Sequence, residues 1–280
     1  MFGIERPSDQ DLKRLLDGEL DDHNMYWAWP RHRTNFGDWI GPYIYLKRTG
    51  IKPRLAHAHQ AGGDRTVYYT CGSILHLLTR KDAAVVWGSG VITATKRFAR
   101  PKRSLAVRGP VTQDRLKRHG YDVPDVVGDP GLCLPFFHEG SSEKSHRLGI
   151  IAHVIDGLFW RSVEKFLPEG VKVIHLDKGF ESVIDEITSC ERTISSSLHG
   201  VIVSHAYGIP CAWVKSCASA LSGDGAKFDD YFMSIGARAR STDAQKVQFP
   251  FRVDGYDFEI CAPSRDLKAM AGQLLEVCPF

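Results

Sequence analysis

The chain has 280 residues, of which 43% are apolar and 25% are charged, close to the averages of soluble globular proteins. This composition excludes a disordered or fibrous chain, and at about 150 residues per domain the length predicts two domains. The formal net charge of +3 comes without a block of basic residues, so we expect no nucleic-acid partner. The charged N-terminus and the lack of a long apolar stretch predict a cytoplasmic protein without a signal peptide or membrane span.

The cysteines number seven, and none has the short paired spacing of a zinc or dithiol site. They predict reduced thiols that mostly fill the core and are dispensable for catalysis. The sequence also lacks a clear cluster of metal ligands, so we expect neither a metal nor a redox cofactor.

The first predicted element is an amphipathic helix over residues 8–20, opened by a Ser-x-x-Asp capping signal. Short apolar runs without two-residue alternation then predict buried parallel strands. They cover residues 25–29, 67–70, 83–87, 105–107 and 126–127. After the fourth run, Pro110 and Gly120 mark the start and the end of a helix.

A polar stretch over residues 136–147 predicts a domain boundary near residue 140. Strand-like runs then resume over 148–154, 171–176, 192–195 and 211–214. Two successive βα series predict an α/β protein with two Rossmann-like, doubly wound domains, 1–140 and 141–280, that face each other across a cleft. We expect the last helix, 263–277, to pack back on the N-terminal domain.

Small or glycine-rich turns follow most of the predicted strands, and such turns can present backbone N–H groups to an anion. Gly88 and Ser89 form one of these turns. Because a βα turn needs a glycine or a cap whether or not it binds a ligand, a purely structural role is the alternative. No GxGxxG or P-loop motif is present, which argues against nicotinamide dehydrogenases and P-loop ATPases.

Arg108 stands between a buried strand and a helix that starts with proline, a costly place for a solvated charge. It could hold a carboxylate or phosphate, or it could pair with an acid such as Asp129. His199 follows a run of serines, among them Ser196 and Ser197, at a predicted helix start. Serine hydroxyls there could cap the helix and bind an anion beside an imidazole able to transfer protons.

Asn35 and Asp38 lie in a polar turn after the first predicted strand. Asp38 could accept a proton from a sugar hydroxyl or hydrogen-bond it. The alternative is a cap for the helix that begins near Trp39, and one carboxylate could serve both roles.

Six stretches of the chain resemble the polysaccharide pyruvyltransferase family, in particular its bacterial exopolysaccharide branch. They are NFGD (35–38), VVWGSGV (85–91), AVRGPVT (106–112), VGDPGL (127–132), ISSSLHGVIVSHAYGIP (194–210) and KFDDYFMSIG (227–236). The resemblance implies a GT-B-like fold and transfer of pyruvate from phosphoenolpyruvate to a sugar, with loss of phosphate and closure of a cyclic ketal. The implied acceptor is a glycan or a lipid-linked oligosaccharide, and the latter would bring the enzyme to the inner face of the membrane.

The resemblance also implies roles for single residues. Arg108 and His199 are expected at the phosphoenolpyruvate site. Together with the residue arguments above, this makes His199 and Asp38 the expected catalytic residues, with phosphoenolpyruvate on the C-terminal domain and the acceptor on the N-terminal domain. Further substrate contacts are expected from Asn35, Gly88, Ser89, Ser196, Ser197, Leu198 and Lys227. Many relatives carry arginine where this chain has Ser197, and the lost cation could be replaced by Arg31, Arg33 or Lys227.

Two other functions compete with this hypothesis. A nucleotide-sugar glycosyltransferase would use a similar two-domain cleft and the same helix N-termini for a diphosphate. A non-catalytic carbohydrate-binding module would more typically offer exposed aromatic residues on a β-sandwich, whereas the aromatic residues of this chain lie inside apolar runs.

Overall fold

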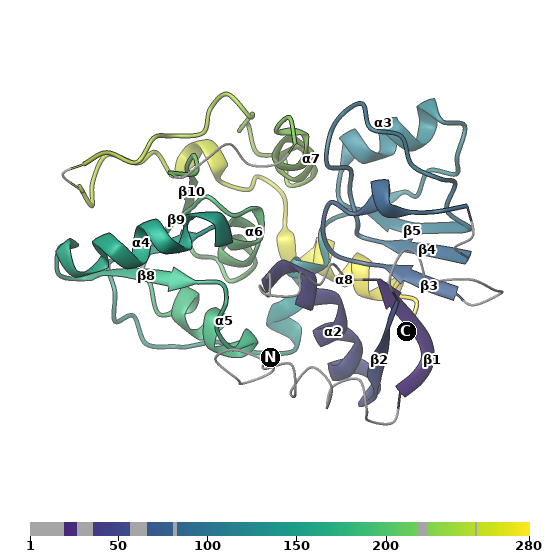
Figure 1. Ribbon diagram of the computed structural model, residues 1–280, viewed down its shortest axis with the longest axis horizontal. Coiled ribbons are helices and arrows are strands. Elements are labelled where there is room, and N and C mark those ends of the chain that lie inside the picture. Colours follow the sequence, from purple (N-terminus) through teal and green to yellow (C-terminus); the bar gives the residue numbers. More distant parts are fainter. Residues whose placement is uncertain (1–19, 27–35, 57–65, 81–82, 218–222, 250) are drawn as a thin grey trace.

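The computed structural model describes residues 20–26, 36–56, 66–80, 83–217, 223–249 and 251–280, and in this part of the chain parallel strands form two sheets (Figure 1). The first sheet has the order β2-β1-β3-β4-β5-β6 and the second has the order β10-β9-β7-β8. Each sheet places its own first strand between its second and third, the order of flavodoxin-like folds. The predicted α/β class with two parallel sheets is therefore confirmed.

The strands of the first sheet are β1 (Leu20–Tyr26), β2 (Lys52–Ala56), β3 (Thr66–Tyr69), β4 (Ala83–Trp87), β5 (Arg103–Val107) and β6 (Val126–Val127). Those of the second are β7 (Leu148–Ala152), β8 (Val171–His175), β9 (Thr193–Ser195) and β10 (Cys211–Trp213). The described α-helices are α2 (Ile40–Thr49), α3 (Pro110–Arg118), α4 (Gly157–Val163), α5 (Phe180–Thr188), α6 (Leu198–Ala206), α7 (Ala226–Ser234) and α8 (Leu267–Glu276). Short 3-10 helices include η1 (Phe36–Trp39), η2 (Leu75–Leu77) and η3 (Pro130–Phe136).

Most predicted strands form where the apolar runs lie, because burial on both faces of a parallel sheet requires such runs. β7, for example, is buried at every position. The first strand starts earlier than predicted, at Leu20, and residues 8–19 of the predicted leader helix and 27–29 of the predicted strand lie outside the described residues. The edge strand β2 was not predicted, because Lys52, Pro53 and Arg54 do not read as a buried run.

Helix boundaries follow local capping chemistry. α3 begins with Pro110 as predicted, and Gly120 follows its C-cap in the left-handed region at φ 67°. α8 begins at Leu267, later than predicted, because the Asp266 side chain accepts a hydrogen bond from the Ala269 N–H at 3.0 Å and fixes the helix start there.

Both sheets are covered on both faces. On the first sheet, Val67, Val86 and Val107 pack with the α3 residue Leu116, whereas Trp87 belongs to the core on the other side. On the second sheet, α5 and α6 cover the face of Ile151, and the α4 residue Trp160 covers the face of Ile150, Val173 and Ile194. This layering makes each sheet doubly wound.

The two sheets are joined by one apolar core rather than by a thin hinge. Residues of α2, η3, α5, α6 and α8 share this core. The predicted boundary at residue 140 falls between η3 and β7. Beyond it, the C-terminal segment returns to the first sheet: the Trp87 indole N–H donates to the Leu274 carbonyl at 2.8 Å, and the Phe280 ring packs on Tyr45, Tyr68 and Trp87.

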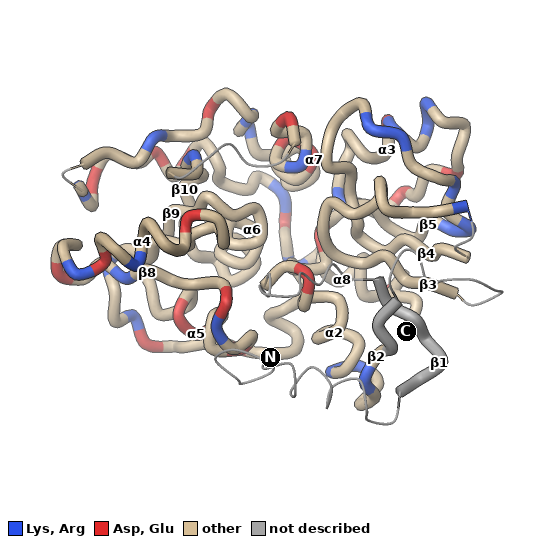
Figure 2. Tube along the Cα trace, in the orientation of Figure 1, with Lys and Arg blue, Asp and Glu red and all other residues tan. Residues whose placement is uncertain are grey.

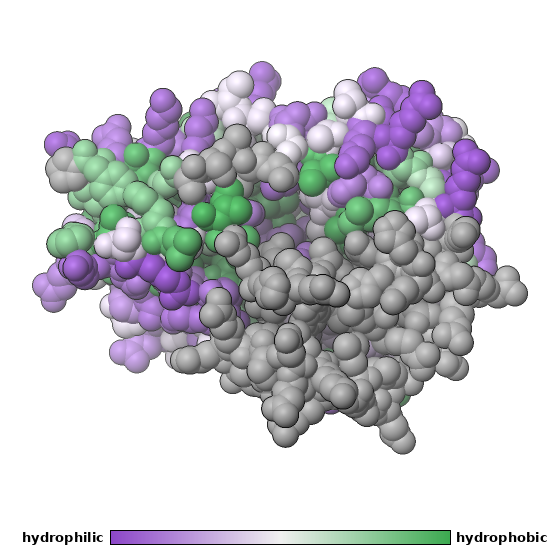
Figure 3. Space-filling view, viewed as in Figure 1, coloured by the Kyte–Doolittle hydropathy of each residue, from purple (hydrophilic) through white to green (hydrophobic). Residues whose placement is uncertain are grey.

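The surface carries charges of both signs across both sheets, with lysine and arginine gathered around α3 (Figure 2). Apolar surface is visible beside α4 (Figure 3), where Leu158 and Phe166 are exposed. Among the helices that the structure describes, none has the length and apolar character needed to cross a bilayer.

Candidate functional site

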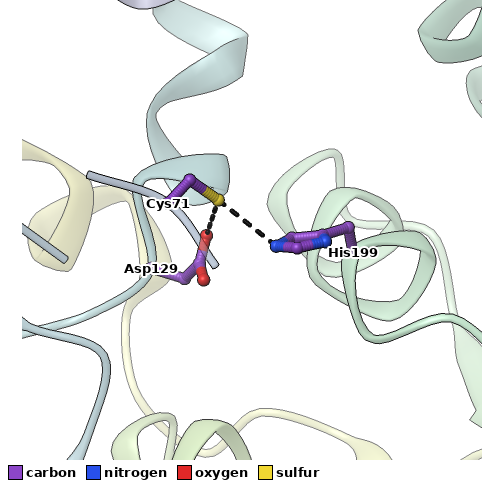
Figure 4. Close-up of side chains that lie close together, drawn as sticks. All are labelled: Cys71, Asp129 and His199. Atoms are coloured by element: carbon purple, nitrogen blue, oxygen red, sulfur yellow. Dashed lines mark hydrogen bonds between the residues drawn. The ribbon is translucent and has the colours of Figure 1, made fainter. Parts of the chain in front are cut away.

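Three polar side chains meet where the carboxyl ends of the two sheets face each other (Figure 4). Cys71 follows β3, Asp129 follows β6, and His199 lies in the first turn of α6. The Cys71 thiol donates to Asp129 Oδ1 at 3.2 Å, and its Sγ lies 3.3 Å from His199 Nε2. Asp129 Oδ1 also accepts from the Gly131 N–H at 2.9 Å, so the start of η3 fixes the carboxylate.

The NFGD turn, which belongs to the part of the chain that forms the first sheet, contacts this cluster. Gly37 lies so near the His199 ring that a side chain at position 37 would collide with Nδ1 and Cε1. Asp38, the next residue, is half-buried and close enough for its charge to act on Cys71. The structure therefore brings Asp38 and His199 to the same centre, while Asn35, Arg31 and Arg33 lie outside the described residues.

Burial controls the protonation of the cluster. Burial, with the charges of Asp129 and Asp38, raises the pKa of the Cys71 thiol well above its usual value. Burial also lowers the pKa of His199, and the charges of Arg108 and Lys227 act in the same direction while Asp129 opposes them. A protonated thiol that donates to Asp129 leaves its sulfur to accept from the His199 Nε2–H. This favours a neutral imidazole whose Nδ1 carries the free electron pair.

Arg108 is fully buried and paired inside the protein. Its Nε donates to Asp230 Oδ2 at 3.0 Å, and further bonds run to the Ser73 hydroxyl at 2.6 Å and the Val91 carbonyl at 2.8 Å. Of the two interpretations of Arg108 from sequence, the ion pair is present, but Asp129 was the wrong partner. Asp230 on α7 takes this place because Gly109 lets its backbone approach the start of α3.

Gly88 and Ser89 have structural partners. Gly88 adopts a left-handed φ of 85°, and Pro130 occupies the space of a side chain there. The Ser89 hydroxyl donates to the Thr70 carbonyl at 2.9 Å, and the Ser89 carbonyl accepts from the Arg108 N–H at 3.2 Å. These contacts favour the structural alternative for this turn.

Most hydroxyls of the serine run before α6 form hydrogen bonds to residues around the second sheet. The Ser196 hydroxyl donates to Asp156 Oδ2 at 2.8 Å and accepts from the His153 N–H at 3.0 Å. Ser197 is the N-cap residue, but its hydroxyl does not cap the helix, so the predicted serine cap is wrong for this residue. Leu198 buries its side chain in the core and offers only its N–H, one of the first-turn donors without an intrahelical acceptor.

Lys227, in the first turn of α7, is a cation without a matching acid. It forms no salt bridge with any acid in the described ranges of the chain. Burial and the charge of Arg108 lower the pKa of its ammonium group to about 8. Its charge in turn lowers the pKa of both His199 and His153. The charge of Lys227 therefore reaches the first turn of α6, where the charge of Asp129 opposes it.

The cluster also has the composition of a metal site. One ligand atom each of Cys71, Asp129 and His199 lies within 4.8 Å of the others, and Asp129 Oδ2 is buried without a hydrogen-bond donor among the described residues. The raised pKa of the thiol and the two cations that act on His199 oppose the binding of a divalent ion. The expectation that no metal takes part remains a prediction.

Cys71 is the functional candidate that sequence reasoning missed. All seven cysteines are free, and for six of them nothing contradicts the role of core or surface filler. Cys71 is also part of the core, but its sulfur contacts His199, so a functional role for it stays open. Its position directly after a buried strand was the available signal, because turns at the carboxyl edge of a parallel sheet converge on one site.

The chain is similar to one protein family and to individual proteins. Residues 12–217 match the family model described as polysaccharide pyruvyl transferase. An uncharacterized protein, L143 of Acanthamoeba polyphaga mimivirus, is 33% identical over 159 residues. That match covers 54% of this chain and 55% of the relative, so the chain spans about half the length of this relative. A crystal structure of the functionally uncharacterized protein KP1_0663 from Klebsiella pneumoniae is 12% identical with a TM-score of 0.40, covering 80% of this chain and 91% of that one.

Proposed function

The chain belongs to the polysaccharide pyruvyl transferase family, and from that premise we propose that it transfers pyruvate from phosphoenolpyruvate to a sugar, as in the bacterial exopolysaccharide branch. The acceptor is a sugar residue of a polysaccharide or of its lipid-linked precursor, and the product is a cyclic ketal with inorganic phosphate released. The observation that most supports a trianionic donor is Lys227, a partly buried cation whose charge acts on His199 and which has no salt bridge among the described residues.

The donor carries a carboxylate and a phosphate, about three negative charges at neutral pH. In our proposal Lys227 supplies a point charge, and the first-turn N–H groups of α6 supply hydrogen bonds. The Ser197 hydroxyl, which has no hydrogen-bond partner among the described residues, replaces part of the arginine that many relatives carry. Arg108 is held by Asp230, so it acts through its electric field and by fixing the turn rather than as the main ligand.

His199 is the proposed proton carrier. Binding of the anionic donor raises the pKa of the imidazole against the lowering by burial, so the ring can take up a proton and deliver it to the methylene carbon. The double-bond electrons form the new C–H bond and leave a cationic centre at C2. A sugar hydroxyl oxygen then bonds to C2 and gives up its proton, for which Asp38 is the candidate base.

The second half of the reaction releases phosphate. The bond between C2 and the phosphate oxygen breaks with its electron pair on the phosphate, and a second hydroxyl bonds to C2 and loses its proton. The overall balance is one phosphoenolpyruvate and one diol converted to one ketal and one phosphate. No step requires an oxidant or a reductant.

The test is phosphate release from phosphoenolpyruvate labelled in its pyruvyl carbons, measured against a panel of acceptor glycans and lipid-linked oligosaccharides. We expect one labelled pyruvyl group in the glycan for each phosphate released. A parallel panel of labelled nucleotide sugars provides the contrast. Transfer of sugar from a nucleotide donor, with no phosphate release from phosphoenolpyruvate on any acceptor, would refute the proposal.

A further inference from the structure

A concave site lies on the first sheet, apart from the cluster of Cys71, Asp129 and His199. It is a groove of about 990 Å³ between the loop after β4, α3 and the segment after η2. Five arginines line it, together with two histidines, and no Asp or Glu among the described residues does. The arginines are Arg80, Arg97, Arg100, Arg115 and Arg118. Arg115 and Arg118 lie on α3, around which Figure 2 shows lysine and arginine, and the surface over α3 is hydrophilic in Figure 3.

The charge of this groove is largely uncompensated. Among its arginines, only Arg118 pairs with a described acid, Asp114, at 2.7 Å. Arg100 and Arg115 donate to the backbone carbonyls of Gly120 and Thr95, at 3.0 and 3.2 Å, and such neutral acceptors leave the positive charge in place. Guanidinium groups are suited to bidentate contacts with carboxylate or phosphate. The groove is therefore built to attract a ligand with several negative charges.

The aromatic residues of the groove argue against a single-stranded nucleic acid. Phe98, His119 and Tyr121 pack on one another, with centroids 5.0 to 6.0 Å apart, and Arg100 covers the Tyr121 ring at 5.5 Å. Rings that are already occupied in this way do not form the exposed stacking platforms that such ligands use. These contacts favour an anionic ligand that is held by its charges rather than by stacking.

The groove is also only a few residues along the chain from Ser73, which is bonded to Arg108. Ser73 accepts a hydrogen bond from Arg108, and His76 in the groove wall is three residues further on, at most about 11 Å along an extended chain. We propose that the groove binds a carboxylate-bearing stretch of the glycan acceptor, outside the sugar that reacts. The identity of this ligand rests on the proposed function, since each pyruvyl ketal adds a carboxylate to the glycan.

The experiment measures binding of a defined acidic oligosaccharide, hexagalacturonic acid, by calorimetry without phosphoenolpyruvate. The test variant is Arg80→Gln with Arg97→Gln, two exposed residues without a hydrogen bond to a described residue. The control is Arg238→Gln with Arg252→Gln, which removes the same charge from exposed positions outside the groove. We expect the test variant to bind about tenfold more weakly, as two exposed charge contacts imply. The control should bind as wild type, and rising salt should weaken binding.

Maltohexaose, which has the same length without charge, should not bind, and a single-stranded DNA oligonucleotide should bind more weakly than the acidic sugar. Equal binding by the test and control variants would overturn the groove as the site. Tighter binding of DNA, or equal binding of maltohexaose, would overturn the class of ligand. Phosphate release on a neutral acceptor is measured in the same variants, so that a failure of the groove is distinguishable from a failure of the proposed reaction.

Discussion

The two sides of the centre use their polar groups differently. On the first-sheet side, Arg108 and Ser89 have their hydrogen bonds satisfied inside the protein. On the other side, Lys227 has no salt bridge with a described acid, and the Ser197 hydroxyl caps nothing. All four residues look like anion ligands in the sequence. The comparison teaches that residue type alone does not identify an anion ligand. A polar side chain that is already bound inside the protein has a structural role, whereas one without such a partner is available for a ligand.

The largest expected effect is on His199. Replacement by Ala should lower the single-turnover rate by about 10²–10⁴-fold, the usual contribution of a general acid or base. Replacement by Gln, which hydrogen-bonds but does not titrate near neutral pH, should preserve donor affinity far better than rate. Donor affinity and single-turnover rate are measured for both variants. A Gln variant with the wild-type rate would show that His199 only positions the donor and that the proton comes from Asp38, another side chain or water.

The next largest effect is expected on the stability of the protein when Arg108 is replaced, and no such loss is expected for Lys227. Arg108→Gln leaves Asp230 buried without its cation, so the free energy of unfolding should fall by about 3–5 kcal/mol. Chemical denaturation provides the measurement. Arg118→Gln, which breaks an exposed pair with Asp114, is the control and should change it by less than about 1 kcal/mol. A stable Arg108 variant that fails to bind donor would reverse the assignment and make Arg108 a direct ligand.

Replacement of Lys227 should instead lower the affinity for phosphoenolpyruvate. Lys227→Gln should weaken phosphoenolpyruvate binding about ten- to a hundredfold, the value of one hydrogen bond to a charged group. Stability should not fall, because the substitution removes a partly buried charge without a salt bridge to a described acid. Lys227→Arg keeps the charge and should retain most of the affinity in calorimetry. Unchanged affinity in the Gln variant would place the donor elsewhere.

The pH dependence of donor affinity tests the role of Lys227 further. Since burial and Arg108 lower the pKa of Lys227 to about 8 and the donor binds the protonated form, affinity should fall above pH 8, by at most about tenfold per pH unit. In Lys227→Arg this decrease should vanish. The sign is opposite for folding: the folded state releases this proton before the unfolded state does, so between the folded and unfolded pKa values the contribution of Lys227 to stability rises with pH. An identical affinity profile for wild type and Lys227→Arg would contradict the role of the lysine.

The smallest effect is expected from metal removal. A protonated Cys71 thiol and two nearby cations disfavour a divalent ion at the cluster with Asp129 and His199. Dialysis against a chelator should therefore leave turnover unchanged, with metal content measured before and after. A loss of turnover that zinc or another divalent ion restores would show that the cluster is a metal centre.

The sequence predicted part of this site because some signals are local. Asp38 and His199 stand in short motifs at strand ends, and the structure brings both to one centre. The position of Cys71 after a buried strand was a local signal too, but it did not single this residue out, because nothing near it in the sequence indicates the imidazole 3.3 Å away. The partner of Arg108 was misassigned for the same reason: Asp230 is 122 positions along the chain, and nearness in sequence favoured Asp129.

The sequence by itself determined the two βα series, the buried strands and the start of α3, because apolar runs and capping residues act over a few neighbouring positions. It also carried the family motifs over most of the chain. Only the tertiary structure decided which charges are compensated. It joined Arg108 to Asp230, left Lys227 without a salt bridge to a described acid and placed Cys71 beside His199. These outcomes depend on contacts between distant segments, where burial makes an unpaired charge costly and a paired one stable.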